Sequence, residues 1–483
     1  MNEIRPTVSS FGPARLLAGT DAGRLDRARH LAVHGPVPVL SSEEVVTLTR
    51  TVDLRGRGGA GFPFARKFQA VVDALRNTQG DPAVVVNGAE GEPSCLKDTA
   101  LLLNAPHLVL DGAEIAAVAL RADEVAVGVA RSDVLASVQQ AMDERRSLSV
   151  RMRVEQLPER FVTGEGSALT NGLNNNPALP SGRKVRTSER GLNGRPTLLS
   201  NTETFAQLAV AARLGAQGFA EVGLPDEPGT AMLTVAGEAV VEAPTGAPLT
   251  YLLQMCGMSV GQGLLVGGYH GMWLSPAAGE LALVSREALK ALGATLGAGA
   301  VLPLPEETCP VGETARVARY MAGESAQQCG PCVWGLARLA DELEALTTYG
   351  GQAAYDAVFS HVRGVLGRGA CSHPDGTSRF VSSALKAFPE DVGRHVYEGG
   401  CGRPVLGVLP VDGKDVGKVT QRLLVDWTLC RAHGLCADVL PGVVQLGPDG
   451  YPSSADMPLK EKERANAVRA VRRCPALALR VVG

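Results

Sequence analysis

Apolar residues recur along this chain with two different periods. Between Phe64 and Leu75 they return every three or four residues, which predicts an amphipathic helix. Short apolar runs elsewhere predict strands, and longer segments between them predict helices. The predicted strands are Ala83–Val86, Glu124–Val129 and Val150–Gln156, and the predicted helices are Leu101–Leu120 and Ser132–Arg145. Because strands alternate with helices, residues 51 to about 220 are expected to form an α/β sheet.

The pattern changes after residue 225. Pro225–Pro228 is typical of a linker, and a small α+β module that ends near residue 308 is expected to follow it. Residues 311–398 predict mostly helices, Val408–Gly417 predicts a second linker, and a last unit of about 65 residues follows. Residues 1–50 form a polar lead-in with one helix. The small module is expected to contain strands at Ala231–Val241 and Gly263–Val266 and a short helix at Pro248–Cys256.

Composition narrows the class of protein. A chain of 483 residues holds roughly two to four domains. Its net charge of −3 and its lack of a basic stripe argue against nucleic acid as a partner. The N-terminus lacks a signal-peptide core, and no uncharged apolar run reaches the ~18 residues of a membrane span. We therefore expect a cytoplasmic protein, in which ten cysteines indicate metal or redox chemistry.

A glycine-rich stretch, Arg55–Phe62, precedes the first predicted helix. Glycines let the backbone approach a ligand closely, and bare N–H groups at a helix start favour an anion such as phosphate. The spacing Gly56-x-Gly58-x-x-Gly61 matches the dinucleotide fingerprint, but that fingerprint follows a strand. Here Ser42–Leu54 is typical of a helix that enters a loop. A phosphate- or flavin-binding loop and a glycine-rich turn without a ligand therefore both remain open.

Polar residues follow the first predicted strand, in Asn87–Pro93. Ligands of α/β sheets lie at the carboxyl ends of strands, so Asn87 could bind a flavin or sugar. Glu90 and Glu92 could hold ribose hydroxyls or an amide, although a capped strand-to-helix turn explains the same residues. Two further stretches, Phe161–Leu169 and Pro196–Thr204, have the same polar and glycine-rich character, and helix capping is their simplest explanation.

Cysteines form one set near residue 330. Cys329 and Cys332 make a C-x-x-C at a helix start, where thiolates are stabilised, and Cys371 lies 39 residues later. With His373, this set could be an iron–sulfur site, a zinc site or a redox pair. Elsewhere, Cys95 and Cys256 are expected to be inert, whereas Cys309 and Cys401 lie close to turn residues and could be spare ligands.

A second cysteine set lies near the C-terminus. Cys430 and Cys436 are followed 38 residues later by Cys474, which precedes a proline. Bacterial ferredoxins use C-x2-C-x2-C with a remote Cys-Pro, and here His433 replaces the middle cysteine. Three thiolates suit a three-iron cluster, [3Fe–4S], or a [4Fe–4S] cluster whose fourth iron takes imidazole. A compact Cys3His zinc site is the alternative.

Taken in order, these stretches resemble a known family. Residues 51 to about 375 look like the NADH-oxidising FMN flavoprotein subunit of respiratory complex I and its relatives in NAD-linked hydrogenases and formate dehydrogenases. Residues 423–483 look like the small actinobacterial-type ferredoxins that supply haem-thiolate monooxygenases. Together they resemble single-chain ferredoxin reductases. The motifs that carry the resemblance are Arg55–Phe62, Asn87–Pro93, Gly164–Leu169, Asn201–Thr204 and Glu324–Cys332.

The resemblance implies cofactors and domains. The implied FMN-binding residues are Gly56, Gly58, Lys67, Asn87, Glu90, Gly164, Glu165, Asn201 and Thr204, and the implied NADH-binding residues are Gly59, Phe62 and Glu92. The cluster ligands are Cys329, Cys332 and Cys371 for one cluster and Cys430, Cys436 and Cys474 for the other, with His433 as a candidate. The expected multidomain α/β + α fold has a lead-in (1–50), a Rossmann-like FMN domain (51–225), a β-grasp module (229–308), a helical-bundle iron–sulfur domain (309–407), a linker (408–420) and an α+β ferredoxin domain (421–483).

Several residues depart from the family pattern. Ala89 replaces an aspartate, Glu165-Gly166 replaces paired acids, and aromatic residues expected near Ala70 and Arg186 are missing. Arg186, with Arg183 and Lys184, could instead meet a 2′-phosphate, so NADPH remains an alternative to NADH. Ala326 replaces one cluster cysteine, which leaves a three-iron cluster, a substitute ligand, or no cluster. The candidate substitutes are Cys401, His373 and a nearby glutamine.

The function implied is that of an NAD(P)H:ferredoxin oxidoreductase with a fused ferredoxin. Hydride passes to FMN, and single electrons pass through the cluster near Cys329 and the cluster near Cys430 to an external acceptor such as a haem-thiolate monooxygenase. One alternative is a diaphorase subunit of a larger hydrogenase or formate dehydrogenase. Another is a non-catalytic zinc or redox-sensing scaffold, which Ala89 and Ala326 favour.

Overall fold

Two units make up the structure, Met1–Pro410 and Val411–Gly483, and each is described by itself. The structure is a computed structural model that describes residues 5–76, 80–145, 149–182, 185–411, 421–459 and 463–482. Of the sequence-based predictions, most of the linker at 408–420 lies outside the described residues, as do Arg183 and Lys184.

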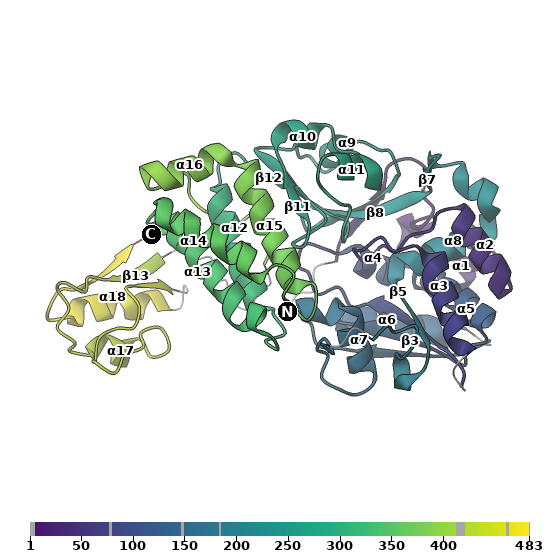
Figure 1. The fold of residues 1–483 in the computed structure, drawn as a ribbon, viewed down its shortest axis with the longest axis horizontal. Helices are drawn as coiled ribbons and strands as arrows, with labels where there is room; N and C mark the ends of the chain where they lie inside the picture. Colours follow the sequence, from purple (N-terminus) through teal and green to yellow (C-terminus); the bar gives the residue numbers. More distant parts are fainter. Residues whose placement is uncertain are drawn as a thin grey trace. The chain divides into compact units, whose positions relative to one another are not determined.

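A four-stranded parallel sheet forms the centre of the first domain (Figure 1). Its strand order is β4-β3-β2-β5. The strands are β2 (Ala83–Gly88), β3 (Glu124–Val129), β4 (Arg151–Gln156) and β5 (Thr197–Asn201). Every residue of β3 and nearly every residue of β2 is buried, because helices cover both faces of a parallel sheet. The alternation predicted from the sequence is confirmed, and β3 has the predicted bounds.

Helices before, between and after the strands surround this sheet. Helix α3 spans Phe64–Leu75 as predicted, and it buries Phe64, Phe68 and Val71. The predicted helix Leu101–Leu120 is instead two helices, α4 (Lys97–Asn104) and α5 (Pro106–Leu120), bent by 95°. Pro106 has no backbone N–H and disfavours helical geometry in the residue before it, so it begins a new helix. The other helices are α1 (Arg27–His34), α2 (Ser42–Thr51), α6 (Ser132–Asp143), α7 (Gly166–Leu173) and α8 (Thr202–Ala220).

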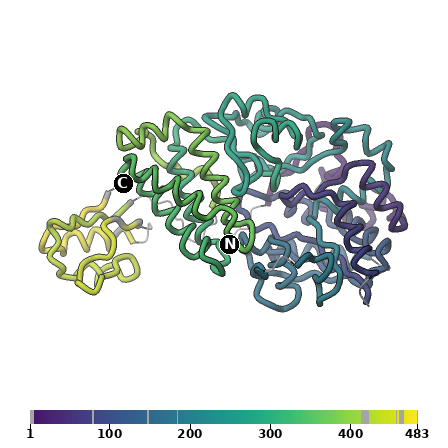
Figure 2. Tube along the Cα trace, viewed as in Figure 1, coloured from purple at the N-terminus to yellow at the C-terminus, as the bar shows by residue number. Residues whose placement is uncertain are grey.

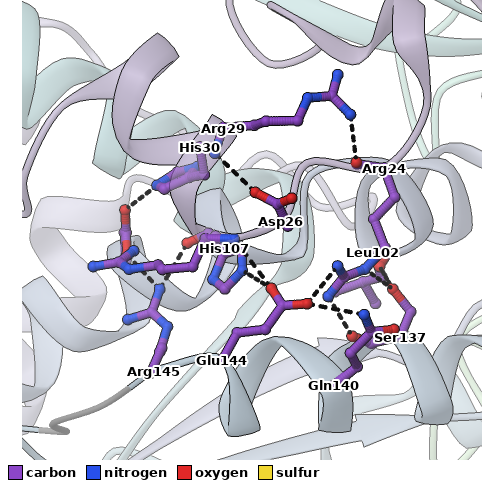
Figure 3. Close-up of polar contacts among 12 residues, drawn as sticks. Arg24, Asp26, Arg29, His30, Leu102, His107, Ser137, Gln140, Glu144 and Arg145 are labelled. Atoms are coloured by element: carbon purple, nitrogen blue, oxygen red, sulfur yellow. Dashed lines mark hydrogen bonds and ion pairs between the residues drawn. The ribbon is translucent and has the colours of Figure 1, made fainter.

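A network of charged side chains ties α1, α5 and α6 together (Figure 3). Glu144, just after α6, accepts hydrogen bonds from His107 Nε2 at 2.7 Å and from Arg24 Nη1 and Gln140 Nε2, each at 2.9 Å. Deeper in the same region, the fully buried Asp111 accepts a 2.6 Å bond from His30 Nε2. These bonds satisfy polar groups that the surrounding helices bury.

A six-stranded mixed sheet follows in the order β1-β9-β8-β12-β10-β11. Its first strand comes from the N-terminal lead-in, where Thr7–Ser10 pairs in parallel with β9. The single strand predicted at Ala231–Val241 is instead a hairpin, because Ala236 and Gly237 both have positive φ, as a tight type I′ turn requires. The remaining elements are β8 (Thr230–Val235), β9 (Ala239–Pro244), β10 (Gly263–Val266), β11 (Met272–Leu274), β12 (Ala300–Leu304), α9 (Leu249–Met255), α10 (Pro276–Glu280) and α11 (Arg286–Ala291).

The segment predicted as a linker at Pro225–Pro228 is part of a small hairpin. Strand β6 (Gly223–Leu224) pairs with β7 (Glu227–Pro228). The buried Glu227 carboxylate accepts bonds from Ser285 Oγ at 2.8 Å and from the Arg286 backbone N–H at 2.9 Å. This acid therefore anchors the segment to the start of α11, so the segment differs from a free linker.

Five helices complete the first unit, in agreement with the helices predicted for 311–398. They are α12 (Pro310–Gly323), α13 (Ala337–Thr348), α14 (Gln352–Val365), α15 (His373–Ala387) and α16 (Pro389–Glu398). A π-helical stretch at Pro331–Leu336 leads directly into α13. Figure 2 shows the five helices as neighbouring green coils. Helix α15 is fixed to the mixed sheet by a 3.0 Å bond from the Trp273 backbone N–H to Ser383 Oγ.

The second unit has its own small core. An antiparallel sheet of order β14-β13-β15 contains β13 (Gln421–Val425), β14 (Asp456–Leu459) and β15 (Leu479–Val482). Helices α17 (Leu435–Val439) and α18 (Arg464–Arg473) accompany it. The core of this unit includes Leu423, Met457 and Ala467, and the three cysteines of the unit pack against it.

Among the residues described, no single helix is long and apolar enough to cross a membrane. The bent pair α4 and α5 reaches the required length and composition only when the two helices are taken together, and nearly all of α5 is buried inside the protein.

Candidate functional site

The candidate site lies where the strand order of the parallel sheet reverses. Strand β2 lies between β3, the next strand in the chain, and β5, the last, and such a switch point is where α/β sheets bind ligands. The last paired residues of β2 and β5 are Asn87 and Asn201. Asn87 Nδ2 donates a 2.8 Å bond to the Gly164 carbonyl, which brings a third polar stretch to the same edge. Three stretches that are distant in sequence therefore meet here.

The glycine-rich loop lies against the start of α8. Its ends are joined by a 2.9 Å bond from the Gly56 N–H to the Phe62 carbonyl, and the Arg57 N–H donates to Thr204 Oγ1 at 3.0 Å. A Cβ at Gly58 would come within 3.2 Å of the Asn201 Cβ. Gly59 and Gly61 have positive φ and open space where a side chain would project. The loop connects α2 to α3, so it lacks the preceding strand of the dinucleotide fingerprint, as the sequence indicated.

Lys67 projects from α3 towards β5. Its ammonium donates a 2.9 Å bond to the Leu199 carbonyl, its one hydrogen-bond partner among the described residues. Burial lowers the pKa of Lys67, because the charged form is desolvated. A half-buried ammonium with N–H bonds to spare is suited to an anion such as a phosphate.

The two acids after β2 make contacts within the protein. Glu90 accepts bonds from the backbone N–H groups of Asp98 at 3.1 Å and Thr99 at 2.9 Å, at the start of α4. Glu92 accepts a 2.6 Å bond from the Tyr269 N–H in the mixed-sheet domain. Burial raises the pKa of each acid to about 7. Both residues therefore stabilise the turn and the domain contact, and no ligand is needed to explain their positions.

Two other predicted residues also act as helix caps. Glu165 accepts bonds from the Ser167 N–H at 3.0 Å and the Ala168 N–H at 2.9 Å at the start of α7. Asn201 accepts a 3.0 Å bond from the Glu203 N–H at the start of α8. Phe62 is different, since it is 47% exposed at the end of the glycine-rich loop.

Sequence reasoning missed a buried ion network beside this loop. Lys97 Nζ lies 2.8 Å from Asp98 Oδ1, 3.2 Å from Glu203 Oε2 and 3.2 Å from Asn201 Oδ1. Burial alone would lower the pKa of Lys97, but these carboxylates outweigh it and raise the pKa. A lysine directly followed by an aspartate, just before the apolar residues of α4, was the available signal.

Lys97 and Glu203 also line a cavity between the glycine-rich loop and the mixed-sheet domain. Other lining residues are Gly56, Arg57, Gly59, Arg286, Lys290 and Gly297. The cavity is thus lined by several cationic side chains and by backbone of two predicted ligand-binding glycines. Arg286 and Lys290, from α11, could not be placed here from the sequence because they come from another domain.

The residues present fit FMN. Bare glycine backbone with positive φ borders open space, and Lys67 supplies a half-buried cation with unused hydrogen-bonding capacity. Ala89, the departure from the family pattern, is buried, and its N–H donates a 3.2 Å bond to Asn87 Oδ1.

The first cysteine set comes together at the π-helical stretch. Burial, together with the neighbouring Cys329 and Cys371, raises the pKa of Cys332 to about 12. The backbone of Ala326 hydrogen-bonds to the same thiol, so the residue that replaces a cysteine does lie at this site. Within the described part of the chain, these three sulfurs do not all lie within the 4.8 Å that a single shared ion requires. Their spacing disfavours the single-zinc alternative and is compatible with a larger cluster.

Two residues that could have replaced the missing cluster cysteine, Cys401 and His373, make other contacts. Cys401 is wrong as a fourth ligand, because it lies with Cys309 and His395 instead. His373 Nε2 donates a 2.7 Å bond to the Met321 carbonyl, and its ring packs against Phe161.

The second cysteine set lines a cavity of the C-terminal unit. Cys430, Cys436, Cys474 and His433 all border it, together with Pro475. Burial raises the pKa of Cys436, as do Cys430 and Cys474. Cys474 Sγ accepts a 3.4 Å bond from the Ala478 N–H. The three thiols and His433 therefore lie together as predicted, at a site whose donors suit an iron–sulfur cluster.

Comparison with known proteins agrees with this geometry. Residues 49–210 match the Nuo51 FMN-binding domain, residues 313–395 match the NADH-ubiquinone oxidoreductase-F iron-sulfur binding region, and residues 423–481 match a 4Fe-4S single cluster domain. The chain is therefore an oxidoreductase that uses FMN and NAD and transfers electrons through 4Fe–4S iron–sulfur chemistry. More particularly, it is an FMN flavoprotein similar to the F subunit of NADH-quinone oxidoreductase, with a C-terminal 4Fe–4S domain.

Similar proteins cover most of the chain. The F subunit of NADH-quinone oxidoreductase from Mycobacterium tuberculosis (strain ATCC 25618 / H37Rv) is 28% identical over 407 residues, covering 78% of this chain and 90% of that protein. The protein of the same name from Streptomyces coelicolor is 28% identical over 393 residues, covering 75% and 85%. The NAD+-reducing [NiFe]-hydrogenase in its H2-reduced state shares the fold with a TM-score of 0.70 and 24% identity, covering 82% of this chain and 68% of that one.

Proposed function

We propose that this chain is an NAD(P)H:ferredoxin oxidoreductase with its ferredoxin fused, and that NADH is the favoured donor. The observation that carries the proposal is the combination in one chain of an FMN-binding domain, an iron–sulfur region and a separate unit with its own cluster site. The relatives, which are named as part of NADH-quinone oxidoreductase, support NADH as the electron source.

The residues of this chain act by binding and positioning. When bound, FMN supplies a centre that accepts hydride and exchanges electrons with one-electron carriers. Lys67 would hold its phosphate, and the glycine-rich loop would let the backbone approach it closely. The proposed FMN-binding residues are Gly56, Gly58, Lys67, Asn87, Glu90, Gly164, Glu165, Asn201 and Thr204, and the proposed NADH-binding residues are Gly59, Phe62 and Glu92.

The C-terminal unit is the proposed exit for electrons. Its three cysteines and His433 support a [3Fe–4S] or a His-ligated [4Fe–4S] cluster. The acceptor proposed is a haem-thiolate monooxygenase, which rests on the resemblance of residues 423–483 to small ferredoxins that supply such enzymes.

The choice of nucleotide depends on the surface near Arg186. This residue is exposed in the segment between α7 and β5, where a 2′-phosphate of NADPH could be bound. NADPH therefore stays as the alternative donor.

An anaerobic visible spectrum of the purified chain tests the proposal. It is recorded before and after addition of NADH and, on a separate sample, NADPH, and iron is counted on the same preparation. We expect a flavin band and a broad iron–sulfur shoulder that bleach with NADH. A colourless protein, or a spectrum unchanged by both nucleotides, would contradict the proposal and favour the scaffold alternative.

A diaphorase subunit is the second candidate function, because the relatives are named as subunits of a larger enzyme. Purification of the tagged chain from its native host distinguishes the two. A stable complex with further redox subunits favours the diaphorase, whereas an isolated chain that reduces a one-electron acceptor protein favours the fused reductase.

A further inference from the structure

A third group of metal-ligating side chains lies apart from both cysteine sets. Cys309, His395 and Cys401 are buried, and their ligand atoms all lie within 4.8 Å of one another. Cys309 Sγ and His395 Nε2 are 3.2 Å apart. Among the residues that the structure describes, no other group of three His, Cys, Asp or Glu side chains meets this condition. The FMN and iron–sulfur sites use none of these three residues.

Each of the three residues is held in a defined position. Cys309 is the N-cap of α12, and its sulfur accepts a 3.2 Å bond from the Gly312 N–H. His395 lies in the last turn of α16, which Gly399 ends with positive φ (81°). Cys401 lies two residues after Gly399. The Gly312 N–H bond fixes the position of the Cys309 sulfur at the start of α12.

The segment that carries Cys401 is fastened to the start of α12. The Cys309 N–H donates a 2.8 Å bond to the Pro404 carbonyl. The fully buried Glu313 accepts a 2.6 Å bond from the Gly407 N–H and a 2.8 Å bond from Thr308 Oγ1. Apolar side chains form a shell around the cysteines, and they include Val311, Leu346 and Val392. The three ligands are therefore held in defined positions among apolar side chains.

The neighbouring charges are already paired. Arg403 forms an ion pair with Asp391, and its positive charge interacts with Cys401. Outer-shell groups of this kind help to orient metal ligands. Since Asp391 is held by Arg403, the two thiols and the imidazole are the available ligands. Two thiolates and a neutral imidazole balance the charge of a divalent cation, which suits a buried site.

The short distances between the three ligand atoms favour a single ion over an iron–sulfur cluster. Zinc binds thiolate sulfur at about 2.3 Å and imidazole nitrogen at about 2.0 Å, so in tetrahedral geometry these two atoms are about 3.5 Å apart. The 3.2 Å between Cys309 Sγ and His395 Nε2 is close to this value. A four-iron cluster would instead separate its thiolates by the width of the cluster.

We propose that Cys309, His395 and Cys401 bind one zinc ion, with water as the fourth ligand. The ion would join the start of α12, the end of α16 and the segment that leads to Pro410. By joining these elements, the ion would fix the last residues of the first unit, after which the C-terminal unit follows in the sequence. The proposal does not depend on the donor or acceptor proposed above.

Metal analysis and X-ray absorption of the full-length protein test the proposal. The protein is expressed with added zinc and purified under reducing conditions, and zinc and iron are counted together. We expect one zinc per chain beyond the iron. The zinc-edge spectrum should show two sulfurs at about 2.3 Å and nitrogen or oxygen at about 2.0 Å.

Variants then assign the ligands. Cys309→Ser and Cys401→Ser should each lose the zinc and keep the iron and flavin content of the parent. Cys256→Ser is the matched control, because Cys256 is a free cysteine outside this group and should retain zinc. Zinc that stays bound in folded Cys309→Ser and Cys401→Ser would overturn the assignment.

Two further results would overturn the proposal without any variant. One is a folded, flavin-loaded parent protein that contains no zinc. The other is a disulfide between Cys309 and Cys401, found by mass spectrometry of peptides from the protein as purified. If the variants do not fold, the zinc-edge spectrum of the parent decides, since coordination by oxygen and nitrogen alone would exclude these ligands.

Discussion

At the scale of single residues, Lys67 indicates an anionic ligand most clearly. The residue is half-buried, and among the described residues its ammonium bonds only to the Leu199 carbonyl. A half-buried lysine without a nearby carboxylate is stabilised by a ligand that supplies negative charge. The FMN phosphate would supply it and would raise the pKa that burial lowers.

Lys67→Met should therefore weaken FMN binding without unfolding the protein. Hydrogen bonds to charged groups contribute about 1.5–3 kcal/mol, which corresponds to roughly ten- to hundredfold weaker binding. Titration of the flavin-free protein with FMN, followed by flavin fluorescence, measures the effect. Lys386→Met, at the far end of α15, is the control and should bind FMN like the parent. Equal affinity in both variants would show that Lys67 does not meet the flavin.

At the scale of elements, α4 and α8 are joined by a buried ion network. Lys97 of α4 is 2% exposed and Glu203 of α8 is 1% exposed. The two groups lie 3.2 Å apart, and Asp98 adds a second carboxylate. Removal of one partner from such a network leaves an uncompensated buried charge.

Lys97→Met should lower the free energy of unfolding by about 3–5 kcal/mol, the range for breaking a buried pair. Glu203→Gln in the same chain should recover part of this loss, because it removes the charge of one of the two carboxylates that Lys97 neutralised. Urea unfolding followed by circular dichroism measures both variants. If Lys97→Met is as stable as the parent, the network does not stabilise the contact of these helices.

The histidines between α1, α5 and α6 predict how stability depends on pH. Burial lowers the pKa of His107 to about 4, and the bond to Glu144 opposes this only in part. The ordinary value is 6.5, so between these limits the unfolded chain binds a proton that the folded chain does not. Stability therefore rises with pH in this window and is lost as pH falls from about 6.5 to about 4.

This dependence is measured as the melting temperature between pH 7 and pH 4. The full shift of His107 corresponds to a loss of the order of 3 kcal/mol. His107→Gln should flatten the fall in this window, since glutamine does not titrate and can still bond Glu144. An equally steep fall in His107→Gln would assign the acid sensitivity to other groups.

At the scale of the whole molecule, the C-terminal unit is the proposed exit for electrons. The C-terminal unit has a separate core and a cavity bordered by Cys430, Cys436 and Cys474. If this unit is the exit, its loss should leave the flavin domain active towards small acceptors.

Cys474→Ser should abolish reduction of a cytochrome acceptor and leave NADH-to-ferricyanide activity unchanged. Serine removes a cluster ligand in the second unit and leaves the first unit intact. Asp449→Asn, in an exposed turn of the same unit, is the control and should keep both activities. Unchanged cytochrome reduction in Cys474→Ser would mean that the C-terminal unit is not the exit.

Local features of this protein were readable from the sequence alone. The period of apolar residues determined helix Phe64–Leu75, and an apolar run determined strand Glu124–Val129, because each pattern is repeated within one element. The second cysteine set was found for the same reason, as its first two members are six residues apart. Breaks within elements were missed at Pro106 and at the Ala236–Gly237 turn, where one or two backbone positions end a continuous apolar pattern.

Only the tertiary structure decided which distant residues meet. Lys97 reaches Glu203 because α4 and α8 both begin at the edge where β2 and β5 end, and strand order cannot be deduced from periodicity. Cys309, His395 and Cys401 form one group because α16 and the segment after it return to the start of α12. The sequence by itself thus determined the elements and the kinds of cofactor, through short-range patterns. The packing of those elements determined the sites, because ligands and ion pairs depend on contacts between residues far apart in the chain.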